Sequence, residues 1–243
     1  MQQCTQAAPS VNLAGVCKSF ANTTVLKSIS LSVSAGESLC ICGPNAAGKT
    51  TLLRIIAGLL KPTHGQVTIC GFDLRRRSDR AKPLVGAVLH KSMLYPQLTV
   101  SENLRFFAQL YGLPDSKSRI EQLLTQLHLG AHTHDRTETL SRGIIQRLAI
   151  ARAMLHKPAI LLADEPFTGL DAQATGDFLA ILAEFANHGG AVLMTTHNPQ
   201  QALKCCGRVA VLHDHRFIFT ADVPEINTSE FAADYLSYTR NNC

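Results

Sequence analysis

Residues 43–50 have the types and spacing of a phosphate-binding loop. Gly43-Pro44-Asn45-Ala46-Ala47-Gly48-Lys49-Thr50 fits the pattern G-x₄-G-K-[ST], between an apolar strand-like run and a helical repeat. The backbone N–H groups of such a loop face phosphates, and the dipole of the following helix favours negative charge there. Lys49 would supply a charge for the β- and γ-phosphates, and Thr50 a hydroxyl for Mg²⁺. A turn without a ligand is the alternative, and the context disfavours it. The residues predicted to bind nucleotide are Gly43, Pro44, Asn45, Ala46, Ala47, Gly48, Lys49, Thr50 and Thr51.

Two acids end a second apolar run, Ile160-Leu161-Leu162-Ala163-Asp164-Glu165. A carboxylate at a strand end suits Mg²⁺, and a second one beside it can position or deprotonate the attacking water. Adjacent acids alone are weak evidence, because solvated strand ends often carry them. Together with the phosphate loop they predict a Mg-nucleotide hydrolysis site, with Asp164 on the metal and Glu165 as the catalytic carboxylate.

The hydrophobic pattern predicts the elements that hold these residues. Strands are expected at 11–16, 25–33, 38–42, 65–69, 85–89, 159–163 and 191–196, with a late hairpin at 209–212 and 216–220. Helices are expected at 48–60, 100–111, 118–129, 144–155 and 176–186, and Thr99 with Glu102 fits a capping box. The pattern is that of an α/β core with a helical segment inserted in the middle.

Composition and charge limit the possible classes of protein. The 243 residues are 46% hydrophobic with a net charge of +5, which suits one sizeable α/β domain. The run Arg75-Arg76-Arg77 is expected to be a solvated face. No aromatic residues are interleaved with it, so no nucleic-acid partner is expected.

The cysteines and the apolar runs bear on the compartment. The eight cysteines have no metal-ligand spacing and are expected to be free thiols in a reducing compartment. The sequence has no secretory signal and no apolar run long enough to span a bilayer. We therefore expect a soluble, cytoplasmic protein whose membrane-spanning helices, if it works at a membrane, come from a partner.

Further motifs, in their order along the chain, resemble those of the ABC-type ATPases. Leu140-Ser141-Arg142-Gly143-Ile144-Ile145-Gln146-Arg147 resembles the signature L-S-G-G-Q-x-Q-R, and Gly169-Leu170-Asp171 resembles the D-loop. His197 follows a predicted strand, as the switch histidine does, and Phe20 occupies the place of the aromatic that stacks on adenine. Alone, a Ser-x-Gly is only a helix start and a histidine after a strand is usually structural; the ordered set favours the family.

The resemblance implies an α/β P-loop NTPase fold with a RecA-like core, an N-terminal antiparallel β-subdomain and an inserted α-helical subdomain. The single nucleotide-binding domain would cover about 10–235, with its core at 10–90 and 158–225 and its helical lobe at 91–157. Glu165 and His197 would be catalytic, and the cofactors would be ATP and Mg²⁺. A head-to-tail homodimer would place Ser141, Arg142, Gly143 and Asp171 on the partner's ATP. Permease subunits would dock on the helical lobe and hold the protein peripherally at the cytoplasmic face of the inner membrane.

Three departures from the family pattern stand out. Ala46 replaces a glycine, which would cost about 1 kcal/mol if that backbone needs a positive φ. Arg142 and Ile144 replace a glycine and a glutamine of the signature, and His90 replaces the Q-loop glutamine, where it would be a tentative Mg²⁺ contact. All three leave the lysine, the metal ligand and the catalytic acid in place, so ATPase activity is still predicted.

The transported substrate is a separate question. His90, LSRGIIQRLAIARAML and DEPFTGLD together resemble the cytochrome c maturation (haem exporter) ATPases. The alternatives are an ATPase of another exporter, for lipids, drugs or polysaccharides, or a soluble ABC ATPase that does not transport. An unrelated P-loop kinase or GTPase would not explain the LSRG block and His197.

Overall fold

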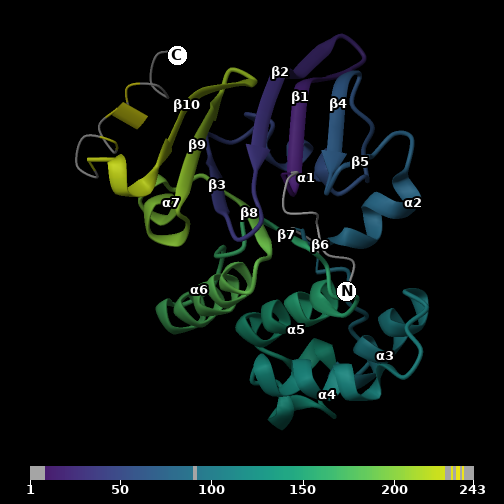
Figure 1. Ribbon diagram of the computed structural model, residues 1–243. Helices are drawn as coiled ribbons and strands as arrows, with labels where there is room; N and C mark the ends of the chain where they lie inside the picture. The colour runs from purple at the N-terminus through teal and green to yellow at the C-terminus, as the bar shows by residue number, and fades with distance from the viewer. Residues whose placement is uncertain (1–8, 90–91, 228–230, 232–233, 236, 238–243) are drawn as a thin grey trace.

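The fold consists of two β-sheets with a helix between them and a separate group of helices (Figure 1). The computed structural model describes residues 9–89, 92–227, 231, 234, 235 and 237. His90, the tentative metal contact, lies outside these residues.

The larger sheet has six strands in the order β10-β9-β3-β8-β7-β6. Its bounds are β3 Ser38–Cys42, β6 Val85–Val88, β7 Ile160–Asp164, β8 Ala191–Thr196, β9 Arg208–His213 and β10 Arg216–Asp222. All neighbours are parallel except β9 and β10, which form an antiparallel hairpin. Every residue of β7 and β8 is buried, as continuous apolar runs in a parallel sheet require.

The smaller sheet is antiparallel, in the order β2-β1-β4-β5. Its strands are β1 Val11–Phe20, β2 Thr23–Val33, β4 His64–Ile69 and β5 Phe72–Asp73. The helix α1, Lys49–Ile56, packs its apolar side chains into one core with both sheets, among them Leu52, Leu53 and Ile56, each fully buried. The first helix of the chain is thus held between the two sheets, and its N-terminus carries the phosphate loop.

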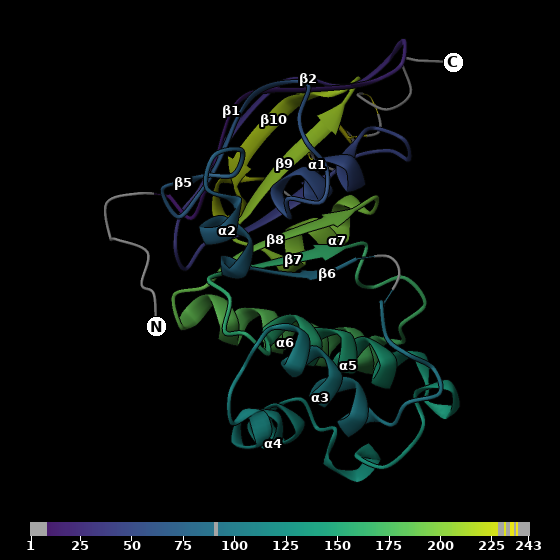
Figure 2. The same ribbon diagram turned by 90° about the vertical axis from the view of Figure 1, so that its right-hand side faces the viewer.

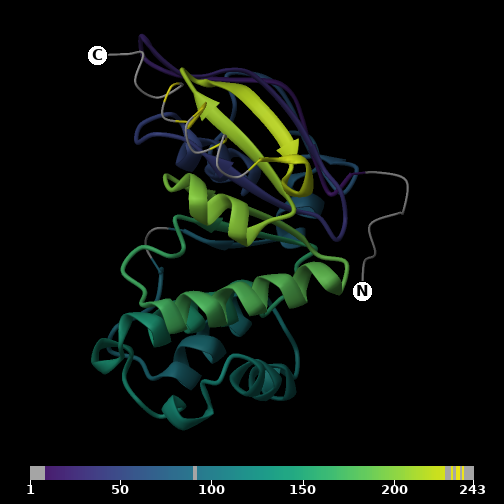
Figure 3. The ribbon, with the colours of Figure 1, turned by 90° about the vertical axis from the view of Figure 1, so that its left-hand side faces the viewer.

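The helices of the middle segment lie on the far side of the larger sheet (Figure 2). They are α3 Val100–Leu110, α4 Ser116–Gln126 and α5 Arg142–Met154, with short 3₁₀ turns at Gly130–His132 and Thr137–Thr139. The predicted capping box is present, since Thr99 accepts from Glu102 N and Glu102 accepts from Thr99 N. The long helix α6, Ala172–Asn187, packs under β8 while α5 packs under β6, so both helices face the sheet (Figure 3).

Shorter helical elements complete the chain: α2 Ser78–Ala81, α7 Pro199–Cys205, and 3₁₀ turns at Lys82–Leu84 and Val223–Glu225. No described helix is both long and apolar enough to cross a bilayer. The arginine run lies at the surface, as expected, with all three residues exposed.

The predicted architecture is confirmed, and the differences have local causes. The helix predicted to reach residue 60 ends at Ile56, because Gly58 takes a φ of +68° and terminates it. The helix predicted from 176 begins at Ala172, because the Asp171 side chain accepts from Ala174 N at 2.7 Å and caps it. The helix α7 was missed, although Asn198-Pro199 is a cap followed by a proline at the first helical position.

The expectation of free thiols holds for Cys17, Cys40, Cys42, Cys205 and Cys206. It is wrong for Cys70, which is disulfide-bonded. The isolated spacing of Cys70 in the sequence gave no sign of this bond.

Candidate nucleotide-hydrolysis site

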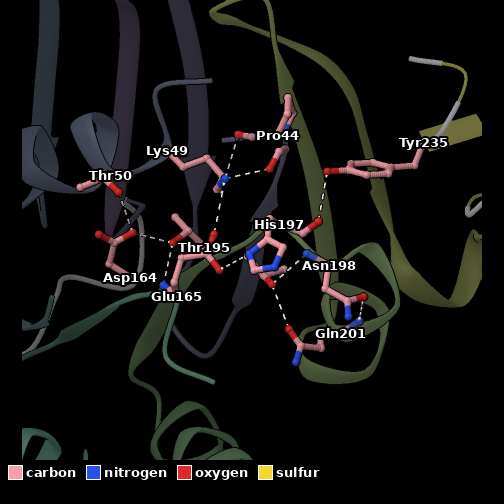
Figure 4. Close-up of polar contacts among 12 residues, drawn as sticks. Pro44, Lys49, Thr50, Asp164, Glu165, Thr195, His197, Asn198, Gln201 and Tyr235 are labelled. Carbon is pink, nitrogen blue, oxygen red and sulfur yellow. Dashed lines mark hydrogen bonds and ion pairs between the residues drawn. The ribbon is translucent and has the colours of Figure 1, made fainter. Parts of the chain in front are cut away.

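Three neighbouring parallel strands place the polar side chains of the predicted site at one edge of the sheet. The strands β3, β8 and β7 lie next to one another, and their carboxyl ends lead into the phosphate loop, His197 and Glu165 respectively. This edge is where open α/β sheets bind their ligands. Figure 4 shows the resulting group of polar side chains.

The backbone of the phosphate loop has positive φ angles at Ala46 and Gly48, a conformation that most side chains disfavour. Gly48 has a φ of +109°, and a Cβ atom there would lie 2.7 Å from the Val25 carbonyl oxygen of β2. Ala46 has a φ of +64°, so this alanine lies in the left-handed region, the condition under which strain was expected there. The loop borders a cavity of about 300 Å³ lined by Val25, Asn45, Ala46, Ala47, Gly48, Lys49, Thr50, Thr51 and Glu165.

Lys49 is nearly buried and points back into its own loop. Its Nζ donates to the carbonyl oxygens of Gly43, at 2.7 Å, and Pro44, at 3.0 Å, and lies 3.5 Å from Oε1 of Glu165. The ammonium therefore lies between the loop backbone and the acid that follows β7. A cation held in this way can bind phosphate oxygens as a point charge.

Asp164 is buried at the end of β7 and is held by two hydroxyls. Its Oδ1 accepts from Thr50 Oγ1 at 3.1 Å and from Thr195 Oγ1 at 2.8 Å, while Thr195 Oγ1 also accepts from the backbone N–H of Glu165 at 3.0 Å. The threonine on β8 thus fixes both acids at once. Sequence reasoning missed Thr195; the signal was its place at the polar end of an apolar strand, just before His197.

The donor set around Asp164 fits Mg²⁺. Hydroxyl and carboxylate oxygens are the ligands that this ion prefers, and it usually keeps waters and substrate phosphates for the rest. The residues that the structure describes contain no cluster of three or more acidic, cysteine or histidine side chains suited to a metal. Among the described residues, Thr50 and Asp164 are the side chains placed to hold the ion.

Glu165 and His197 face each other across the same edge. Nδ1 of His197 lies 2.9 Å from Oε2 of Glu165, and the imidazole is 59% exposed against 20% for the carboxylate. Glu165 has a φ of +48°, an uncommon backbone for a non-glycine residue that turns the chain sharply after β7. The carboxylate borders the cavity and can accept a proton from a water held there.

The signature and D-loop residues come together in a different place. Ser141 caps α5, accepting from Ile144 N at 3.4 Å, and a Cβ at Gly143 would be 3.4 Å from Cβ of Ala174 on α6. A Cβ at Gly169 would lie 2.7 Å from Nη1 of Arg142. Ser141, Arg142 and Asp171 are exposed, and these residues do not line the cavity beside Lys49. The predicted helix start at Ser141 is confirmed.

Phe20 also lies apart from the cavity lining. It ends β1 and is 47% exposed, with the Lys18 ammonium 4.8 Å from its ring centroid. Two other contacts were not foreseen: Gln146 Nε2 on α5 donates to the Pro166 carbonyl at 3.2 Å, and the Tyr235 hydroxyl donates to the His197 carbonyl at 3.3 Å. Both join distant segments, which the local pattern cannot reveal.

Comparisons with known proteins agree with this geometry. Residues 26–168 match the family described as ABC transporter. The chain is 39% identical over 207 residues to the uncharacterized ABC transporter ATP-binding protein YdbJ of Bacillus subtilis, covering 85% of this chain and 67% of that protein. It is 34% identical over 228 residues to the Nod factor export ATP-binding protein I of Ralstonia nicotianae, covering 93% and 71%. A solved ATP-binding subunit of an ABC transporter superposes with a TM-score of 0.82 at 26% identity, covering 93% of this chain and 98% of the other.

Proposed function

Because the chain belongs to the ABC transporter ATP-binding family, we propose that it hydrolyses ATP at the edge of β3, β8 and β7 and couples this to export by membrane partners. The observation that carries the proposal is the contact of Glu165 with both Lys49 and His197 beside the cavity. A phosphate-binding cation, a general base and an orienting imidazole are the parts that γ-phosphate hydrolysis needs.

The role of each residue follows from its place. The loop Gly43–Thr51 and Lys49 bind the phosphates, and Glu165 orients the attacking water and takes its proton. His197 holds the Glu165 carboxylate through Nδ1 and presents the rest of its ring toward the γ-phosphate. Thr50 and Asp164 would hold Mg²⁺, which supplies charge neutralisation on the phosphates. His90 remains a prediction from the sequence as a further contact of this ion.

The signature residues act on a second copy of the chain. Ser141, Arg142, Gly143 and Asp171 lie at the N-terminal ends of α5 and α6, away from the cavity beside Lys49. Helix N-termini favour bound phosphate, and Ser141 and Asp171 are exposed. A head-to-tail homodimer brings them onto the ATP held by the partner's phosphate loop, and Phe20 stacks on the adenine of its own ATP.

The direct test is Glu165→Gln in the full chain. We expect hydrolysis to fall at least about 100-fold while ATP still binds, because the amide keeps the shape of the carboxylate but cannot take a proton. ATP should also trap this variant as a dimer by light scattering. The exposed Glu121→Gln on α4 is the matched control and should hydrolyse at the native rate. Native hydrolysis by Glu165→Gln would show that another group is the base.

The membrane partner docks on the helical segment. Of the seven exposed large apolar side chains among the described residues, four lie between positions 93 and 111: Met93, Tyr95, Leu110 and Tyr111. Apolar side chains gathered in one exposed segment mark an interaction surface. The protein is thus held peripherally at the cytoplasmic face through permease subunits. Co-purification from solubilised membranes tests this, and Leu110→Glu should reduce it while the surface variant Lys61→Glu should not.

The exported substrate is proposed at the level of a class. One relative at 34% identity is named for Nod factor export, another for linearmycin resistance and a third, at 33%, for spermidine/putrescine import. The export name favours an exporter other than the haem exporter. The resemblance to cytochrome c maturation ATPases rests on His90 and on the residues of the LSRGIIQRLAIARAML and DEPFTGLD segments. Identifying the co-purified membrane subunits would decide between a haem exporter and another exporter. Haem-handling subunits would support the haem exporter.

A further inference from the structure

Tyr235 connects a late segment of the chain to the hydrolysis site. It belongs to the segment after β10, and it is 6% exposed. Its hydroxyl donates to the carbonyl oxygen of His197 at 3.3 Å (Figure 4). The tyrosine thus contacts the backbone of the residue whose imidazole holds Glu165, on the side away from the cavity.

The tyrosine packs in the same apolar core as Cys42, the last residue of β3 and the neighbour of Gly43. Burial raises the pKa of Tyr235, so the phenol keeps its proton near neutral pH and can donate it to the His197 carbonyl.

Apolar packing holds Phe231 and Tyr235 in this place. Phe231 is 4% exposed, and its ring centroid lies 5.4 Å from that of Phe219 on β10. Phe231 and Tyr235 both belong to the apolar core that contains Cys42 and Ala202 of α7. The tyrosine ring is thus anchored by packing, independently of its hydroxyl.

The imidazole of His197 is 59% exposed, and its Nδ1 lies 2.9 Å from Oε2 of Glu165. The next residue, Asn198, is held from the other side, since its N–H donates to Thr196 Oγ1 at 3.1 Å. A small movement of the His197 carbonyl would carry the imidazole away from Glu165, and displacements of about 1 Å can cost 100-fold in rate.

We propose that Tyr235 is a positioning residue for ATP hydrolysis, whose hydroxyl holds the His197 carbonyl and so keeps the imidazole on Glu165. This inference rests on the proposed function, because it assigns a role to His197 in that reaction. It makes the segment after β10 part of the hydrolytic machinery in addition to part of the core.

The test compares Tyr235→Phe with Thr125→Val in the full chain. Both variants lose one hydroxyl, but Thr125 is exposed on α4 and does not line the cavity. For Tyr235→Phe we expect kcat to fall about 5-fold with the affinity for ATP changed less than about 2-fold, because the loop contacts remain. Its melting temperature should fall by only about 2–4 °C. Thr125→Val should keep the native kcat.

Nitrogen NMR of the histidine rings separates positioning from general stability. The His197 ring signals, assigned from their loss in His197→Ala, should shift in Tyr235→Phe and stay in place in Thr125→Val. A native kcat for Tyr235→Phe would overturn the proposal, and so would a lowered kcat with unmoved His197 signals. Native hydrolysis by His197→Ala would instead contradict the proposed function. Loss of hydrolysis in His197→Ala with native kcat in Tyr235→Phe would overturn this inference alone.

Discussion

The Thr195 hydroxyl on β8 donates to Oδ1 of Asp164 on the neighbouring strand β7 at 2.8 Å. Thr195 Oγ1 in turn accepts from the Glu165 backbone N–H at 3.0 Å. One buried side chain thus sets both the orientation of the proposed metal ligand and the sharp turn that carries the proposed base. The link crosses between strands, so the relative placement of the two acids depends on the register of β7 against β8.

Thr195→Val should therefore damage both stability and hydrolysis. Valine has nearly the same shape, but it leaves the Glu165 N–H without its partner, which costs about 1–3 kcal/mol. We expect a melting temperature lower by about 2–4 °C for each kcal/mol, and a kcat reduced about 10-fold. Thr195→Ser keeps the hydroxyl and is the matched control. Equal behaviour of the two variants, by calorimetry and ATPase assay, would refute a role for this hydroxyl.

Lys49→Ala should weaken nucleotide binding itself. Its ammonium is buried between two loop carbonyls and Glu165, and its loss removes the only lysine charge that borders the cavity lined by the described residues. We expect the affinity for ATP to fall at least about 10-fold by titration calorimetry, since charge-assisted contacts are worth about 1.5–3 kcal/mol. Lys61→Ala, exposed beyond α1, should bind ATP as the native chain does. Unchanged affinity in Lys49→Ala would contradict the phosphate site.

Position 46 should accept glycine and reject a β-branched residue. The φ of +64° at Ala46 costs an alanine about 1 kcal/mol, and a β-branched side chain more. Ala46→Gly should keep the native ATP affinity and change the free energy of unfolding by less than about 1 kcal/mol, because relieved strain offsets the greater freedom of the unfolded chain. Ala46→Val should lower both. If valine is tolerated as well as glycine, the loop does not hold this backbone conformation.

Histidine 156 should make the chain less stable in mild acid. Burial lowers the pKa of His156, and the charges of Arg152 and Arg119 lower it further, against the raising effect of the bond to the Val85 carbonyl. The folded state therefore binds this proton less readily than the unfolded state, whose histidine pKa is about 6.5. Stability is fully present above that value and is lost as the pH falls below it.

The measurement is the melting temperature at pH 7.5 and pH 5.5. His156→Gln keeps a donor for Val85 but cannot be protonated, so it should lose less stability across this range than the native chain does. The difference is bounded by about 1.4 kcal/mol per pH unit for one proton. His134→Gln, which is exposed, should follow the native chain. An identical fall in His156→Gln and the native chain would rule out this source of acid sensitivity.

The sequence predicts those features of this protein that depend only on residues close together along the chain. The phosphate loop, the acids after β7 and the Ser141 cap each need only a short stretch whose chemistry and position agree. The end of β1 shows where this local information stops. The strand predicted at 11–16 extends to Phe20, because residues 18–20 pair with β2. Pairing with a distant strand decides that boundary.

Long-range contacts at the site were not predictable in the same way. Thr195 and Tyr235 are ordinary residues in their local context, and they matter because strand order and the last apolar contacts bring them to Asp164 and His197. The Cys70 disulfide is a similar case, since nothing near it in the sequence indicates a bond. Chemistry that depends on two segments meeting needs the fold to be known first.

The position of β8 between β3 and β7 has a consequence for how the protein folds during its synthesis on the ribosome. Both flanking strands leave the ribosome before β8 does, because chains emerge from the N-terminus. In the described residues β3 pairs with β8 and β9, so no strand pairing joins the phosphate loop to the acids after β7 until β8 has been made. The hydrolysis site is therefore assembled late, when β8 is inserted between two strands that left the ribosome before it.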